Sequence, residues 1–132
     1  MNPDTTDLAT RLAERAAGAW QEEAAVWLIT HHGHWLPELE RTGLIHDDGD
    51  GRSRIAWRQV ASTCLSAGDG PLTGTPVEWQ VLRLACLLTG RHALSLANLS
   101  LLDEPTKRMG LHAVAWASGG RTWADSLSLL AA

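Results

Sequence analysis

The sequence predicts an all-α fold, a single helical domain (1–132) of about six helices around a central buried helix at about 75–89. Three observations lead to this prediction. Apolar residues recur at helical spacing along most of the chain. Capping residues, prolines and glycines stand where those helices would begin and end. The intervening connections are short, which is typical of helices that pack directly against one another.

The segment around 75–90 carries the clearest of these signals. Thr75 and Glu78 have the spacing of a capping box, and Pro76 occupies the first helical position, where its missing N–H costs nothing. Gly90 is placed to end the helix in a left-handed conformation. Apolar residues cover more than one face between these ends: Val77, Trp79, Val81, Leu82, Leu84, Ala85, Cys86 and Leu88. We therefore expect several neighbouring helices to cover this one.

The N-terminal part reads as one long helix from Pro3 to about Thr30. Its apolar positions follow helical spacing: Leu8, Leu12, Ala16, Trp20, Ala24 and Trp27. Gly18 lies inside this helix, where glycine costs about 1 kcal/mol relative to alanine, so a bend or a close backbone contact is expected there. Gly33 is a suitable stop after the last turn.

Shorter elements follow in the middle of the chain. A turn of helix from Pro37 to Arg41 would close at Gly43. The segments 44–46 and 54–56 flank a turn rich in Asp and Gly and suggest a minimal hairpin near 44–56. A third helix is expected over about 55–67.

The C-terminal third predicts three more helical pieces. A short helix is expected over 94–101. Asp103 can cap a longer one that ends at Gly119 and Gly120. Thr122 and Asp125 then form a capping pair for a last amphipathic turn or two.

Composition and charge narrow the range of functions expected for the protein. The formal net charge of −4 argues against nucleic acid or a membrane surface as the main partner. No apolar run approaches the roughly 18 residues of a membrane span, and the first residues lack the pattern of a secretory signal. Cys64 and Cys86 lie in apolar helical patterns typical of buried free thiols. We therefore expect a cytoplasmic protein, and the bias toward Trp and Arg suggests a bacterial genome rich in G and C.

Histidines suggest one possible metal site. His31, His34 and His46, with Asp48 or Asp50, could together bind a divalent metal, as in a metal-binding protein or hydrolase. No HExxH motif or paired cysteine ligands support this alternative, and the Asp-Gly turn does not fit the EF-hand pattern. We favour a polar helix end that binds no metal, since histidine is stabilised there by the helix dipole.

The sequence contains no motif for nucleotide binding or acyl transfer, so no cofactor, catalytic residue or small-molecule ligand is predicted. The basic cluster of Arg52, Arg54 and Arg58 lies beside three aspartates, which would cancel much of its field. The favoured hypothesis is therefore a non-catalytic protein that acts through protein contacts, either with another protein or with a second copy of itself as a homodimer. Trp20, Trp27 and Trp35 are the predicted interface residues.

Overall fold

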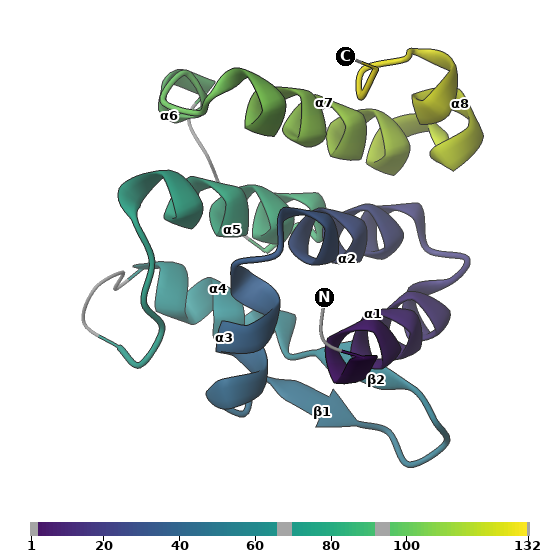
Figure 1. Ribbon diagram of the computed structural model, residues 1–132, viewed down its shortest axis with the longest axis vertical. Coiled ribbons are helices and arrows are strands. Elements are labelled where there is room, and N and C mark those ends of the chain that lie inside the picture. Colours follow the sequence, from purple (N-terminus) through teal and green to yellow (C-terminus); the bar gives the residue numbers. More distant parts are fainter. Residues whose placement is uncertain (1–2, 66–69, 92–95, 132) are drawn as a thin grey trace.

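Two helices, α2 and α5, form the middle layer of the structure (Figure 1). The structure is a computed structural model that describes residues 3–65, 70–91 and 96–131. The elements in chain order are α1 (Pro3–Ala16), α2 (Trp20–His32), α3 (Trp35–Arg41), β1 (Ile45–Asp47), β2 (Ser53–Ile55), α4 (Trp57–Leu65), α5 (Pro76–Leu88), α6 (Leu96–Leu99), α7 (Glu104–Gly119) and α8 (Arg121–Ser126). The all-α prediction is confirmed. In Figure 1, α6, α7 and α8 lie on one side of the middle layer, and α1, α3, α4 and the hairpin lie on the other.

The central helix has the predicted ends. The Thr75 hydroxyl accepts a hydrogen bond from the Glu78 backbone N–H, and the Glu78 carboxylate accepts one from the Thr75 N–H at 2.8 Å. Gly90 has a φ of 78°, in the left-handed region expected for the stop. The helix packs against α2, α4 and α7, and most of its apolar side chains are buried.

The single helix predicted from Pro3 to about Thr30 is wrong, because the chain breaks at Gly18. Gly18 adopts a φ of 98°, which side-chain-bearing residues rarely tolerate, so α1 ends at Ala16 and α2 starts afresh at Trp20. The new helix packs against α1, α3, α5 and α7. The centre of the domain is thus shared between α2 and α5.

The short helix α3 begins at Trp35, two residues before the predicted start. The Trp35 side chain is fully buried, and its indole N–H donates to the Glu78 carbonyl at 2.7 Å. This bond joins α3 to the first turn of α5. Trp35 is therefore a core residue that fixes the position of α3.

The predicted hairpin is present. Ile45 pairs with Ile55, and His46 with Arg54, in antiparallel register. Packing against α1 and a hydrogen bond from Arg11 to the Ser53 hydroxyl at 3.1 Å support this two-stranded sheet. Its end fixes the start of α4 at Trp57, slightly later than predicted, while residues 66 and 67 lie outside the described ranges.

The C-terminal helices follow the predicted order. α6 falls within the predicted 94–101 segment, of which residues 94 and 95 are outside the described part of the chain. α7 begins after Asp103 and ends at Gly119, as expected, but the Asp103 side chain makes no capping hydrogen bond. The Thr122–Asp125 capping pair is wrong, because α8 already begins at Arg121, directly after Gly120. No helix in the described ranges has both the length and the apolar character of a membrane span.

Candidate functional site

The three predicted interface tryptophans lie in different environments. Trp20 is 48% exposed, whereas Trp35 is in the core and offers no surface to a partner. Trp27 is partly buried, with its ring stacked on His31 at 4.7 Å between centroids and tilted against His112 at 4.8 Å. Of the three, Trp20 alone presents half of its side chain to solvent.

The predicted metal ligands do not converge. Helix α2 ends at His32, so His31 and His34 do not share a helical face. The two ring nitrogens of His34 contact the Glu78 carboxylate at 3.1 Å and the Thr73 carbonyl at 2.9 Å, which makes it a structural bridge. Within residues 3–65, 70–91 and 96–131, no three His, Cys, Asp or Glu side chains are grouped suitably for a metal.

The aspartates of the hairpin turn are also used internally. Asp48 accepts hydrogen bonds from Arg15 at 3.0 Å and from Arg54 at 3.1 Å. Asp50 accepts one from the backbone N–H of Arg52 at 3.2 Å, within the turn itself. The metal-site alternative is therefore not supported by the placement of these residues.

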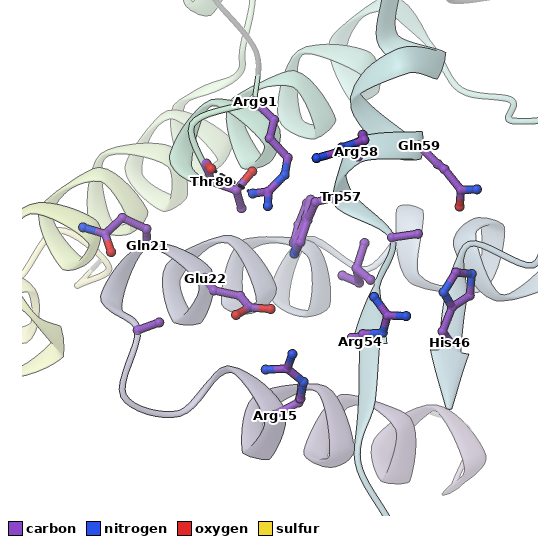
Figure 2. A pocket seen from close by; sticks show the side chains of 13 residues that line it. Arg15, Gln21, Glu22, His46, Arg54, Trp57, Arg58, Gln59, Thr89 and Arg91 are labelled. Carbon is purple, nitrogen blue, oxygen red and sulfur yellow. Dashed lines mark hydrogen bonds between the residues drawn. The ribbon is translucent and has the colours of Figure 1, made fainter. Parts of the chain in front are cut away.

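A different set of residues lines a cavity of about 600 Å³ between the starts of α2 and α4 (Figure 2). We call it the arginine pocket, and its lining residues are Arg15, Ala19, Gln21, Glu22, His46, Arg54, Ile55, Ala56, Trp57, Arg58, Gln59, Thr89 and Arg91. They come from α1, α2, both strands, α4 and the segment after α5. A volume of this size is typical of small-molecule sites.

The four arginines of the pocket differ in their partners. Arg15 and Arg54 share the single carboxylate of Asp48. Arg91 donates to the Thr89 carbonyl at 2.9 Å, which is a neutral acceptor. Arg58 makes no hydrogen bond or ion pair within the described chain. At least two guanidinium groups therefore lack a carboxylate partner here.

The floor of the pocket contains a polar group without a partner. Ile55, Ala56 and Trp57 are buried, and the indole of Trp57 is only 6% exposed. Its Nε1–H is buried and has no acceptor within the described residues. Figure 2 shows the nitrogen edge of this indole turned toward the side of the pocket that holds Glu22 and Arg15. A buried donor without an acceptor costs about 1–3 kcal/mol, and this nitrogen has almost no surface that a ligand in the pocket could reach.

Two helix N-termini add to the positive potential. The residue before α2 is Ala19 and the residue before α4 is Ala56, and both line the pocket. Alanine has no side-chain acceptor, and Ala19 makes no side-chain capping bond to the first turn of α2. Helix N-termini carry a partial positive charge and unpaired N–H groups, both of which favour anions.

The acidic part of the pocket is small. Glu22, in the first turn of α2, is the one acid among the lining residues, and it makes no hydrogen bond or ion pair within the described chain. A carboxylate can only accept hydrogen bonds when ionised, so it is matched by a donor on a ligand. The pocket thus combines several cations with one unpaired acceptor.

The basic cluster noticed in the sequence was the available signal for this site. Arg54 and Arg58 do line the pocket, and among the aspartates of the turn, Asp48 is the one that forms ion pairs within the described residues. Asp47 accepts from the Gly49 backbone N–H at 2.8 Å and thus, like Asp50, serves the turn. Arg15 and Arg91 come from distant segments, and sequence reasoning missed them.

A second cavity, of about 310 Å³, lies between α1, α2 and α7 and shows the opposite arrangement. The Trp116 indole N–H donates to one Glu23 oxygen at 3.0 Å, and the Gly18 backbone N–H donates to the other at 2.9 Å. The Arg121 guanidinium lies over the Trp116 ring, 5.2 Å from its centroid. The polar groups here are paired with one another.

Comparison of the chain with protein-family models, curated proteins and solved structures gives no match. The pocket geometry is therefore the basis for the functional proposals below.

Proposed function

We propose that the protein binds an anionic small molecule in the arginine pocket. The observation that supports this most is the convergence of four arginines on one cavity in a chain whose net charge is −4. Guanidinium groups match carboxylates and phosphates in geometry and stay charged at all physiological pH values. The start of α2, where Ala19 makes no side-chain capping bond, supplies further donors.

Calorimetric titration with inorganic phosphate, pyrophosphate and citrate at low and physiological salt tests this proposal. We expect Arg58→Ala to weaken binding by about tenfold, since a hydrogen bond to a charged group is lost. Arg58 is exposed and has no partner to lose within the described chain, so the melting temperature should not change.

Arg108→Ala is the matched control. Arg108 is an exposed arginine of α7, paired with Glu104 at 3.2 Å, and it does not line the pocket. Anion affinity should be the same in this variant as in the wild type. Equal losses in both variants would mean general charge attraction, and a lack of binding by every anion at millimolar concentration would refute the proposal.

A second function, contact with another copy of the chain, is favoured by one surface. Trp20 and Trp123 are each 48% exposed, and their rings lie beside Gly120 and Gly119, consecutive residues at the end of α7. Large apolar side chains that remain exposed together are typical of association surfaces. We propose these two tryptophans as the centre of a homodimer contact.

Light scattering over a concentration series distinguishes a homodimer from a monomer. We expect dimers that Trp123→Ser dissociates, while Leu65→Ser, at a residue 81% exposed on α4, leaves them intact. A monomer at all accessible concentrations would rule the contact out.

A further inference from the structure

We infer that the ligand of the arginine pocket is a phosphate monoester in its dianionic form, attached to an organic group that carries a hydroxyl. This inference rests on the proposed anion-binding function and adds to it a charge, a shape and a second recognition element.

The charge follows from the pairing within the pocket. The pocket is lined by four arginines and by Glu22, and Asp48 pairs with two of these arginines, so the arginines exceed these two carboxylates by two charges. A phosphate monoester carries a charge of about −1.5 to −2 at pH 7, because its second pKa is about 6. A sulfate ester or a single carboxylate carries only one negative charge and would leave the pocket cationic.

The position of the phosphate follows from the unpaired arginines. Arg58 projects from the first turn of α4 and Arg91 from the segment after α5, and Figure 2 shows both near the end of the Trp57 ring away from its nitrogen. Arg15 and Arg54 lie on the other side and are held by Asp48. Donors that approach from different elements suit the several oxygens of a tetrahedral phosphate. The phosphate therefore binds at Arg58 and Arg91.

The remaining groups define what the phosphate is attached to. The Glu22 carboxylate accepts no hydrogen bond within the described residues. Figure 2 shows Glu22 beyond the nitrogen edge of Trp57, away from Arg58 and Arg91. A hydroxyl can donate a hydrogen bond, so a hydroxyl of the ligand can pair with the Glu22 carboxylate. The cavity of about 600 Å³ is also much larger than a bare phosphate requires.

Glucose 6-phosphate is the probe for this inference, and glucose 6-sulfate is its matched control. Both have a tetrahedral anion and the same hydroxyls, but the sulfate ester has one negative charge. In calorimetric titrations we expect the phosphate ester to bind at least about tenfold more tightly than the sulfate ester. Succinate, a flexible dianion, should also bind more weakly than glucose 6-phosphate, since its carboxylates are planar and separated.

A variant of Glu22 tests the hydroxyl contact. Glu22→Ala removes a negative charge as well as an acceptor, so inorganic phosphate should bind more tightly. The preference for glucose 6-phosphate over inorganic phosphate should fall by about fivefold or more. Glu40→Ala, at an exposed residue of α3 outside the pocket, should leave both affinities unchanged.

The possible failures are distinguishable. Equal affinity for the two glucose esters would overturn the inference that the ligand is a dianion. Tighter binding of succinate than of glucose 6-phosphate would overturn the inference that the anionic group is a phosphate. An unchanged preference in Glu22→Ala would overturn the hydroxyl contact. Each of these results leaves anion binding in place, whereas a failure of inorganic phosphate, pyrophosphate and all these probes to bind would remove the proposed function itself.

Discussion

Two sites in this protein contain the same three residue types but differ in whether their polar groups are hydrogen-bonded. Each contains a tryptophan, a glutamate and arginine, and the glutamates are neighbours, Glu22 and Glu23, in the first turn of α2. Around Glu23, the Trp116 N–H and the Gly18 N–H both donate to its carboxylate. Around Glu22, neither the carboxylate nor the Trp57 N–H has a partner within the described chain.

The difference separates a structural site from one suited to a ligand. Buried polar groups in folded proteins are nearly always paired, because an unpaired one costs as much as a lost hydrogen bond. The Glu23 site follows this rule and links α2 to α7. The arginine pocket departs from it at Trp57, which is as buried as Trp116 at 6% exposure. His112, beside the Glu23 site, has a buried Nδ1 that also lacks a partner within the described residues, so what distinguishes the arginine pocket is the unpaired Arg58 and Glu22 side chains.

The largest expected effect comes from exchanging each indole for a phenyl ring. Trp116→Phe removes the donor to the Glu23 carboxylate, whereas Trp57→Phe removes an N–H that has no acceptor among the described residues. Both changes lose similar volume at equally buried positions. We expect Trp116→Phe to be the more destabilising by about 1.5–3 kcal/mol, measured by urea unfolding, since that hydrogen bond involves a charged group. Equal losses would show that Trp57 is also paired.

A smaller effect is expected from pH, through His112 beside the Glu23 site. His112 contacts Trp27 and Trp116, and burial lowers its pKa below 6.5 against the opposing effect of Asp125, 3.6 Å away. Arg121 and His31 lower this pKa further. A lowered folded-state pKa means that the unfolded chain takes up the proton first. Stability from neutral His112 is therefore complete above about pH 6.5 and falls as the pH drops below it.

Comparison with His112→Gln isolates this contribution from that of His32, whose pKa is also lowered by burial. The stability difference between wild type and variant, from urea unfolding, should shrink between pH 7.5 and 5.5. A difference that stays constant over this range would mean that His112 titrates alike in the folded and unfolded chains. Binding at the arginine pocket should not depend on this substitution.

The helix ends could be predicted where their signals are local. Thr75, Glu78 and Gly90 satisfy the backbone of their own helix, so their roles follow from spacing alone. Gly18 was ambiguous, because glycine permits a bend as well as a complete change of direction. The choice depends on how α1 and α2 pack against different neighbours, which no local pattern records.

The arginine pocket could not be predicted from the sequence, for a related reason. Arg54 and Arg58 are close in the chain, but Arg15 and Arg91 join them only through the packing of α1 and α5 around α2 and the hairpin. The interface tryptophans were also predicted from their spacing in the sequence. Trp35 and Trp57 show why spacing is not enough. The Trp35 indole N–H donates to the Glu78 carbonyl, whereas the Trp57 indole N–H has no acceptor within the described chain.

The smallest expected change in stability, and the last test of the comparison, is Asp48→Asn. Asp48 holds Arg15 and Arg54 at the edge of the arginine pocket, and both arginines are more than 40% exposed, so the ion pairs contribute little. We expect the free energy of unfolding to change by about 0.5 kcal/mol or less. The two guanidinium groups would then lack a counter-charge, and pyrophosphate should bind about two- to fivefold more tightly at low salt, with the gain reduced at physiological salt by screening. The Glu23 site offers the contrast, since Glu23→Gln exchanges a paired carboxylate and should lower stability without strengthening pyrophosphate binding. Weaker binding by Asp48→Asn would show that Asp48 serves mainly to hold the arginines in position, and that the pocket depends on their geometry more than on its net charge.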